Sequence, residues 1–193
     1  MARMPAVRKR DHRSDAELIE ACNSGDAKDA TTAFGELYRR HKDFVVRVAY
    51  RSSDDHQIAL DALQETFTWL LKQFPPPGAG ITLTAKLTSY LYPIARNSAL
   101  TLLRKKQRFT AGSDVDPDSL PSQEPQASDD IDSLLAVLPA ERRELVLLRF
   151  VEGMSMNEIG DVLGIPVGTV KSRLHLAIQQ LRNSPRTKTF FDL

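Results

Sequence analysis

The stretch from Ser155 to Arg182 constrains the fold of this chain more than any other. Ser155 and Glu158 have the spacing of a capping box, in which each side chain satisfies a free backbone amide at the start of a helix. This pattern predicts a short helix from Met156 to Leu163, which Gly164 ends by supplying a left-handed residue. Pro166, whose φ is preset, then starts a second helix.

The second helix has an apolar face and a polar face. The apolar residues recur at helical spacing and are Val170, Leu174, Ala177, Ile178 and Leu181. The hydroxyl and cationic residues of its leading turns are Thr169, Lys171, Ser172 and Arg173, with His175 beside them. This arrangement is typical of a helix-turn-helix, whose second helix fits the major groove of DNA. Such side chains reach phosphates and base edges together, so we expect a DNA reader; a helical hairpin with a solvated basic face is the alternative.

Composition narrows the class of protein. The net charge of +1 argues against a histone-like polycation, and no apolar run reaches the roughly 18 to 20 residues that span a bilayer. A single cysteine, Cys22, cannot form an internal disulfide, so we expect it to be a small buried residue. The four histidines lack metal-ligand spacing. We therefore expect a cytoplasmic protein without membrane insertion, cofactor or metal, and no set of catalytic residues indicates an enzyme.

Helical periodicity predicts an all-α protein with two small helical domains joined by a flexible acidic linker. We expect a disordered basic tail over residues 1–13 and a first helical domain over 14–109. The linker, rich in Asp, Ser and Pro, covers 110–128. A second domain over 129–184 contains the helix-turn-helix, and a tail covers 185–193.

Within the first domain, Ser14 and Glu17 repeat the capping-box spacing. A long apolar stripe from Phe34 to Ala49 includes His41, which we expect to be a hydrogen-bonded structural histidine. Asp54 is expected to cap a third helix. Prolines and glycines then predict a loop from 75 to about 83, and a fourth helix follows from about 84 to 108.

Two surfaces of this domain carry polar groups. On the third helix, the face with Asp61, Gln64 and Glu65 is opposite the apolar stripe, as in any solvated helix. On the fourth helix, four cations follow an asparagine and two tyrosines: Arg104, Lys105, Lys106 and Arg108 after Tyr90, Tyr92 and Asn97. Basic groups interleaved with aromatic rings favour single-stranded nucleic acid, although helical tyrosines are also common in cores.

Three runs of sequence, in this order around the linker, are DALQETF (61–67), LYPIARNSALTLLR (91–104) and GTVKSRL (168–174). With them the chain resembles the extracytoplasmic-function (ECF) group of bacterial RNA polymerase sigma factors. Residues 34–108 look like the second conserved region of that family and residues 131–182 look like its fourth.

The resemblance implies a sigma factor that binds core RNA polymerase, recognises promoter DNA and promotes transcription initiation, including promoter melting. The clamp helices of the polymerase would bind Asp61, Gln64, Glu65 and Phe67. The downstream promoter element, with its unpaired bases, would contact Tyr90, Tyr92, Arg96, Asn97, Arg104, Lys105, Lys106 and Arg108. The helix-turn-helix would read the upstream element as duplex.

The resemblance also implies a regulatory partner. Sigma factors of this group are commonly held by an anti-sigma factor, so such a protein or another regulator is an expected partner. The chain departs from the family's usual motifs at Tyr90, Pro93, Thr101 and Leu176. The alternative reading is a stand-alone helix-turn-helix regulator that binds duplex DNA.

Overall fold

The structure, a computed structural model, describes residues 11–24, 26–75, 78–111, 129–185 and 187–188. Its elements in chain order are α1 (Asp15–Asn23), α2 (Ala27–Ser53), α3 (His56–Lys72), α4 (Leu87–Ala111), α5 (Asp129–Leu135), α6 (Ala140–Val146), the π-helix η2 (Leu147–Val151), α7 (Met156–Leu163) and α8 (Val167–Asn183). The described ranges contain no strand, so the predicted all-α class is confirmed.

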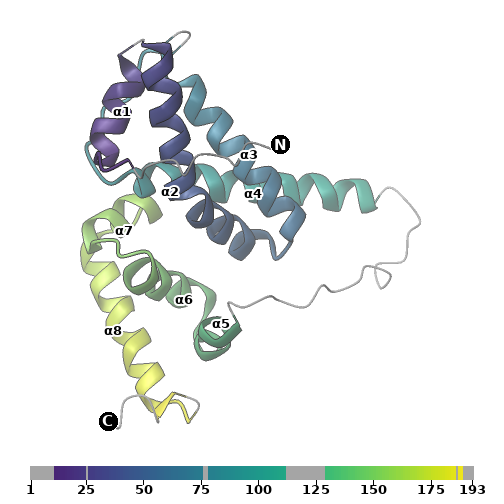
Figure 1. Ribbon diagram of the computed structural model, residues 1–193. Coiled ribbons are helices and arrows are strands. Elements are labelled where there is room, and N and C mark those ends of the chain that lie inside the picture. The colour runs from purple at the N-terminus through teal and green to yellow at the C-terminus, as the bar shows by residue number, and fades with distance from the viewer. Residues whose placement is uncertain (1–10, 25, 76–77, 112–128, 186, 189–193) are drawn as a thin grey trace, which may run out of the picture. The chain divides into compact units, whose positions relative to one another are not determined.

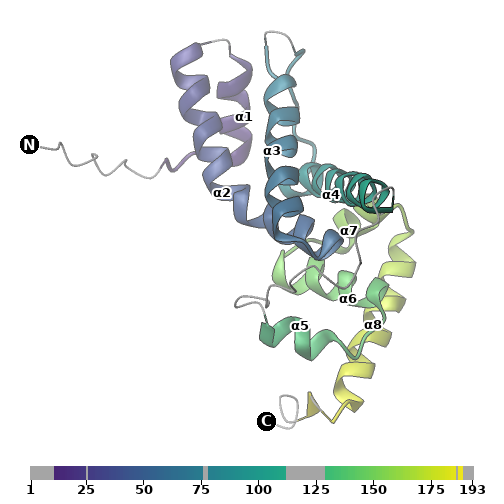
Figure 2. The same ribbon diagram turned by 90° about the vertical axis from the view of Figure 1, so that its right-hand side faces the viewer.

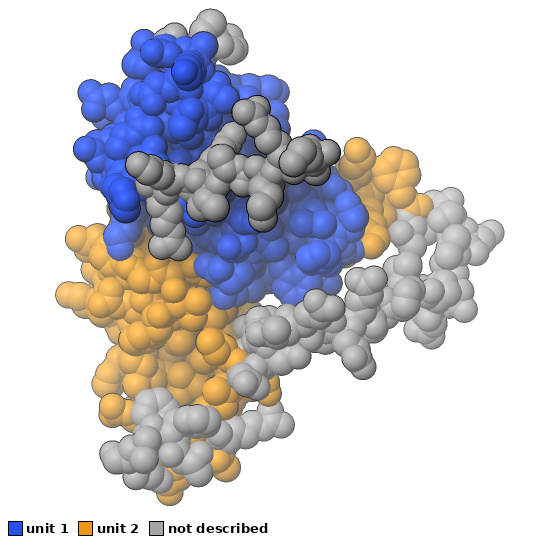
Figure 3. Space-filling model, in the orientation of Figure 1, with its two compact units in different colours: residues 1–104 blue, residues 105–193 orange. Residues whose placement is uncertain are grey.

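The chain divides into two compact units, residues 1–104 and 105–193 (Figure 3). The domain limits expected from the sequence, 14–109 and 129–184, stay a prediction. The linker at 110–128 and the tails lie largely outside the described residues.

In the first unit, α2 packs against both α1 and α3. Helix α4 lies across α3 (Figures 1 and 2) and shares a buried cluster with α2 and α3. This buried cluster consists of Ala49, Ile58, Ala59, Ala62 and Ala99. Its alanines are small enough to let α2, α3 and α4 approach one another closely. Leu37, Leu70 and Leu91 are also fully buried. Burial of this kind contributes roughly 25 cal/mol for each Å² of apolar surface removed from water.

Helix starts in this unit follow local sequence signals. The capping box of α1 is confirmed: Glu17 N donates to Ser14 Oγ at 3.3 Å and Ser14 N donates to Glu17 Oε2 at 2.6 Å. The prediction that Asp54 caps the third helix is wrong by one residue. Asp54 adopts φ 51° and ends α2, whereas Asp55 accepts a hydrogen bond from Ile58 N at 3.0 Å and caps α3.

A polar network ties α1 and the residues before it to α2. Arg40 donates to the backbone oxygens of Asp11 and Arg13 at 2.7 and 2.8 Å, and to Asp15 Oδ1 at 3.1 Å. His41 Nε2 lies 2.7 Å from Asp15 Oδ2, which confirms the expected structural histidine. This hydrogen bond with His41 lowers the pKa of Asp15, and Arg40 lowers it further.

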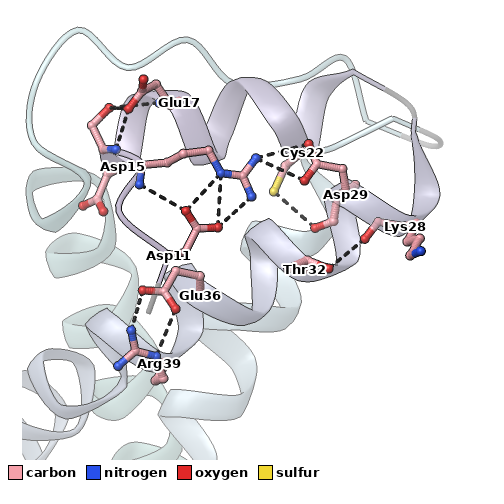
Figure 4. Close-up of polar contacts among 12 residues, drawn as sticks. Asp11, Asp15, Glu17, Cys22, Lys28, Asp29, Thr32, Glu36 and Arg39 are labelled. Carbon is pink, nitrogen blue, oxygen red and sulfur yellow. Dashed lines mark hydrogen bonds and ion pairs between the residues drawn. The ribbon is translucent and has the colours of Figure 1, made fainter. Parts of the chain in front are cut away.

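Two further side chains of the first unit, Glu36 and Cys22, are buried. Figure 4 shows Glu36, which is buried, with Arg39 at its carboxylate. Cys22 is 2% exposed, so the expected buried cysteine is confirmed. Burial raises the pKa of its thiol to about 11.

In the second unit, α6 and α7 both pack against α8. Its largest fully buried side chains are Leu145, Leu148, Met154, Ile159 and Val170. The stretch between Pro139 and Gly153 forms α6 followed directly by η2. Gly153 has φ +66° and follows the end of η2, as a glycine that ends a helix does.

Candidate nucleic-acid interface

The helix-turn-helix is built by local signals. Ser155 N donates to Glu158 Oε2 at 2.7 Å and Glu158 N donates to Ser155 Oγ at 3.2 Å, so the predicted capping box of α7 is confirmed. Gly164 has φ +66° and ends α7. A Cβ on Gly160 would lie 2.9 Å from the carbonyl oxygen of Ile165, so the turn between the helices leaves no room for a side chain there.

Helix α8 separates its apolar and polar side chains as predicted. Val170, Leu174, Ala177 and Leu181 are buried. Of the five residues predicted to contact DNA, Lys171, Ser172 and His175 are exposed, while Thr169 and Arg173 are half-buried. These five residues lie in the leading turns of one helix, and the apolar side of that helix is packed. The geometry leaves the other side of α8 free to enter a groove.

Arg173 has a partner that sequence reasoning did not identify. Its Nη1 lies 3.0 Å from Glu141 Oε2 in α6. The two residues are far apart in sequence, and neither belongs to a motif that pairs them. Only the packing of α6 against α8 brings this carboxylate to Arg173.

Helix α4 presents a polar stripe, which we define as Tyr90, Asn97, Thr101, Arg104 and Arg108. These positions recur at spacings of seven, four, three and four residues and therefore share one side of the helix. All are exposed except Tyr90, which is half-buried. The stripe places an aromatic ring, an amide and two guanidinium groups in a line.

The remaining residues predicted for the downstream element lie elsewhere on α4. Lys105 is exposed beside the stripe, and Lys106 is exposed on another side of the helix. Arg96 is half-buried, and Tyr92 is only 4% exposed. A ring that is buried to this extent has no free face for base stacking in this conformation, so Tyr92 belongs to the core of the unit here.

Helix α3 carries the predicted polymerase face. Gln64 and Glu65 are exposed, and Asp61 is half-buried. Asp61 precedes Gln64 by three residues and Glu65 by four, so the three side chains share one side of the helix. Phe67 is 4% exposed, and its ring packs edge-on against Phe34 and Tyr38, with centroids 6.2 and 4.8 Å apart. Phe67 therefore supports this surface from within.

Two exposed leucines border the polar residues of α3. Leu60 is 40% exposed and Leu71 is 54% exposed. Glu65 also accepts a hydrogen bond from Ser98 Oγ of α4, a contact that the sequence did not indicate. One carboxylate thus lies both on the exposed side of α3 and against the helix that carries the polar stripe.

The described residues contain neither a candidate metal centre nor a membrane span. Within those ranges, histidine, cysteine and carboxylate side chains form no group that could hold a metal ion. None of the described helices combines the length and the apolarity that crossing a bilayer requires.

Comparison with known proteins agrees with this geometry. The family described as Sigma-70 region 2 matches residues 37–109, and the family described as Sigma-70, region 4 matches residues 128–181. The chain is 34% identical to the ECF RNA polymerase sigma factor SigE of Mycolicibacterium smegmatis over 80% of this chain and 62% of that protein. It is 32% identical to the ECF sigma factor SigM of Mycobacterium tuberculosis over 85% of this chain and 81% of that protein.

Solved structures share the fold. The sigma factor RpoE, in complex with the anti-sigma factor NepR from Bartonella quintana, has a TM-score of 0.55 and 24% identity over 77% of this chain and 94% of that one. CnrH, in complex with the cytosolic domain of CnrY, also has a TM-score of 0.55 and 24% identity. This match covers 86% of this chain and 94% of that one. Taken with the two matched regions and the sequence relatives, these findings show that the chain belongs to the ECF sigma factors of the sigma-70 family, non-enzymatic proteins that direct RNA polymerase to promoters for transcription initiation.

Proposed function

We propose that α8 reads the upstream promoter element in the major groove through Thr169, Lys171, Ser172, Arg173 and His175. The support is the arrangement of α8 itself: its apolar side is buried, and Lys171, Ser172 and His175 face solvent together. Cations near the start of such a helix bind phosphates, and hydroxyl groups reach either phosphates or base edges.

The downstream element is assigned to α4. The polar stripe offers an aromatic ring for stacking, an amide that can both donate and accept, and guanidinium groups for phosphates. Unpaired bases need such groups, because they must leave the stack and find new partners on the protein. On this basis α4 holds the melted strand through the stripe, with Arg96, Lys105 and Lys106 adding positive charge and Tyr92 supporting the helix from within.

Core polymerase is assigned to the exposed side of α3, through Asp61, Gln64 and Glu65, with Phe67 holding the helix in place. The exposed Leu60 and Leu71 supply apolar area at both ends of this surface. A mixture of apolar and polar side chains is what protein interfaces use.

Regulation and location follow from the same assignment. A protein of the anti-sigma class is a proposed partner, supported by the complex in which the structural neighbour RpoE is bound to NepR. A cytoplasmic location is proposed because RNA polymerase and promoter DNA are there. Residues 37–109 match Sigma-70 region 2. This match does not support the alternative, a stand-alone regulator that binds duplex DNA.

Run-off transcription tests the proposal as a whole. Core polymerase is incubated with genomic DNA fragments with and without this protein, and the 5′ ends of the transcripts are mapped. We expect start sites that depend on the protein and share an upstream and a downstream element. Transcripts that are identical in the two reactions would refute it.

A further inference from the structure

The loop between α3 and α4 is held by α1, a helix that lies outside the residues matched by either sigma-70 region. Asn23, the last residue of α1, forms two hydrogen bonds with one residue of the loop. Its Nδ2 donates to the carbonyl oxygen of Ile81 at 2.7 Å, and its Oδ1 accepts from Ile81 N at 3.0 Å. A primary amide can satisfy both backbone groups of one residue in this way, because it carries a donor and an acceptor side by side.

The residue before Ile81 is shaped around this amide. Gly80 has φ +91°, a conformation that side chains rarely adopt, and a Cβ there would lie 2.7 Å from Asn23 Oδ1. Gly80 N also donates to the carbonyl oxygen of Gln73 at 2.8 Å, which anchors the loop to the end of α3. Glycine is thus required at this position for two independent reasons, its backbone angle and the close approach of Asn23.

The next residues of the loop are held by Tyr90 of α4. The hydroxyl of Tyr90 donates to the carbonyl oxygen of Thr82 at 3.2 Å and lies 3.1 Å from Thr84 Oγ1. Asn23 and Tyr90 therefore bind adjacent residues of the same loop. The Ile81–Thr82 segment thus links the amide of Asn23 in α1 to the hydroxyl of Tyr90 in the polar stripe.

We propose that Asn23 is a positioning residue for the downstream promoter contact. It fixes the loop that holds Tyr90, and so keeps the Tyr90 ring in line with Asn97 before DNA arrives. The inference rests on the proposed role of α4 in binding unpaired bases. Preorganisation of this kind increases affinity, since the ordering of the loop does not have to occur on binding.

The test uses the full chain assembled with core polymerase and two DNA probes from a promoter mapped by run-off transcription. One probe is a fluorescein-labelled single-stranded oligonucleotide that carries the non-template strand of the downstream element. The other is a duplex that carries the upstream element alone. The variants are Asn23→Ala and Asn97→Ala, with Asn183→Ala as the matched control, because Asn183 is the last residue of α8 as Asn23 is of α1.

We expect Asn23→Ala to weaken single-strand binding by between about fivefold and 150-fold, the effect of losing two ordinary hydrogen bonds. Duplex binding should stay within about twofold, and Asn183→Ala should change neither. If Asn97→Ala weakens single-strand binding and Asn23→Ala does not, the inference fails while the role of α4 stands. If neither variant weakens it, both fail.

Further variants separate positioning from general loss of structure. Ser14→Ala removes the N-cap of α1 but keeps Asn23, and Tyr90→Phe keeps the ring but removes its hydroxyl. We expect Tyr90→Phe to weaken single-strand binding, and to add little in the Asn23→Ala background because both changes release the same loop. A loss with Ser14→Ala equal to that with Asn23→Ala, or full additivity of Asn23→Ala and Tyr90→Phe, would overturn the positioning role.

Discussion

The guanidinium of Arg173 in α8 forms an ion pair with Glu141 in α6, with 3.0 Å between Nη1 and Oε2. The side chains are 39% and 75% exposed, so water screens the pair and its contribution to folding is at most about 1 kcal/mol. The pair matters more for DNA binding. If Arg173 contacts a phosphate as proposed, it has to leave this carboxylate to do so.

The first prediction follows from this competition. Glu141→Ala should tighten binding to the upstream element by up to about fivefold, since Arg173 no longer has to leave a partner that contributes about 1 kcal/mol at most. Arg173→Ala should weaken binding and make the salt dependence shallower by about one phosphate contact. Fluorescence anisotropy at several salt concentrations measures both effects.

The double variant is the control for this prediction. In the Arg173→Ala background, Glu141→Ala should change affinity little, because the competing pair is already absent. Weaker binding by Glu141→Ala alone would mean that the carboxylate orients Arg173 towards DNA instead of competing with DNA for it.

A second prediction concerns the polymerase face. Replacing both Gln64 and Glu65 by Lys should weaken association with core polymerase by more than about tenfold. Glu65→Lys reverses a charge and Gln64→Lys adds one, and unmatched charges at an interface cost several kcal/mol. Binding of the free protein to the upstream duplex should survive. Surface plasmon resonance with immobilised core polymerase measures the association.

Two controls define this surface. Glu20→Lys reverses an exposed carboxylate on α1, outside the face, and should leave association unchanged. Ser98→Ala removes the α4 partner of Glu65 without changing charge, and should leave it unchanged as well. Equal losses with Glu20→Lys and with the double substitution would remove the assignment of α3.

The third prediction concerns promoter opening. Asn97→Ala should reduce permanganate reactivity of the melted region by about tenfold, the effect of one lost base contact of 1 to 3 kcal/mol. Gln107→Ala is the matched control, since Gln107 is an exposed amide on the same helix outside the polar stripe. Lost duplex affinity with intact opening would contradict the melting role of Asn97.

The fourth prediction compares the two capping boxes. Ser155→Ala should destabilise α7 by about 1 kcal/mol and speed hydrogen exchange at the amide of Glu158, which loses its acceptor. Ser14→Ala should do the same to α1 and the amide of Glu17. Hydrogen exchange followed by NMR resolves the two amides. Each change should affect its own unit, and faster exchange of both amides in either variant would contradict independent capping.

The fifth prediction is a pH dependence that arises from Asp15. Its pKa is lowered in the folded state, mainly by the hydrogen bond with His41, so the ionised carboxylate stabilises the fold at and above its ordinary pKa. That stability is lost as the pH falls below about 4 through the lowered pKa. Asp15→Asn should therefore flatten the acid limb of unfolding in urea while lowering stability at pH 7. An acid limb as steep as that of the unchanged protein would exclude Asp15 as its source.

Local signals in the sequence predicted helices and their ends well. Both capping boxes, the glycine that ends α7 and the apolar side of α8 are found where the residue spacing placed them. These features depend on neighbours within about four residues, so a linear pattern contains the information. The error at Asp54 shows the limit, because two adjacent aspartates can each cap a helix and the sequence does not say which residue ends α2.

Pairings between distant residues could not be read in the same way. Burial separates Phe67 and Tyr92 from the exposed residues of their motifs, and it depends on which helix packs against them. The contacts of Glu141 with Arg173, Ser98 with Glu65 and Asn23 with Ile81 join residues 32, 33 and 58 positions apart. The residue types and their helical order are written in the chain, whereas these contacts exist only once helices pack, since packing alone brings distant donors and acceptors within hydrogen-bond distance.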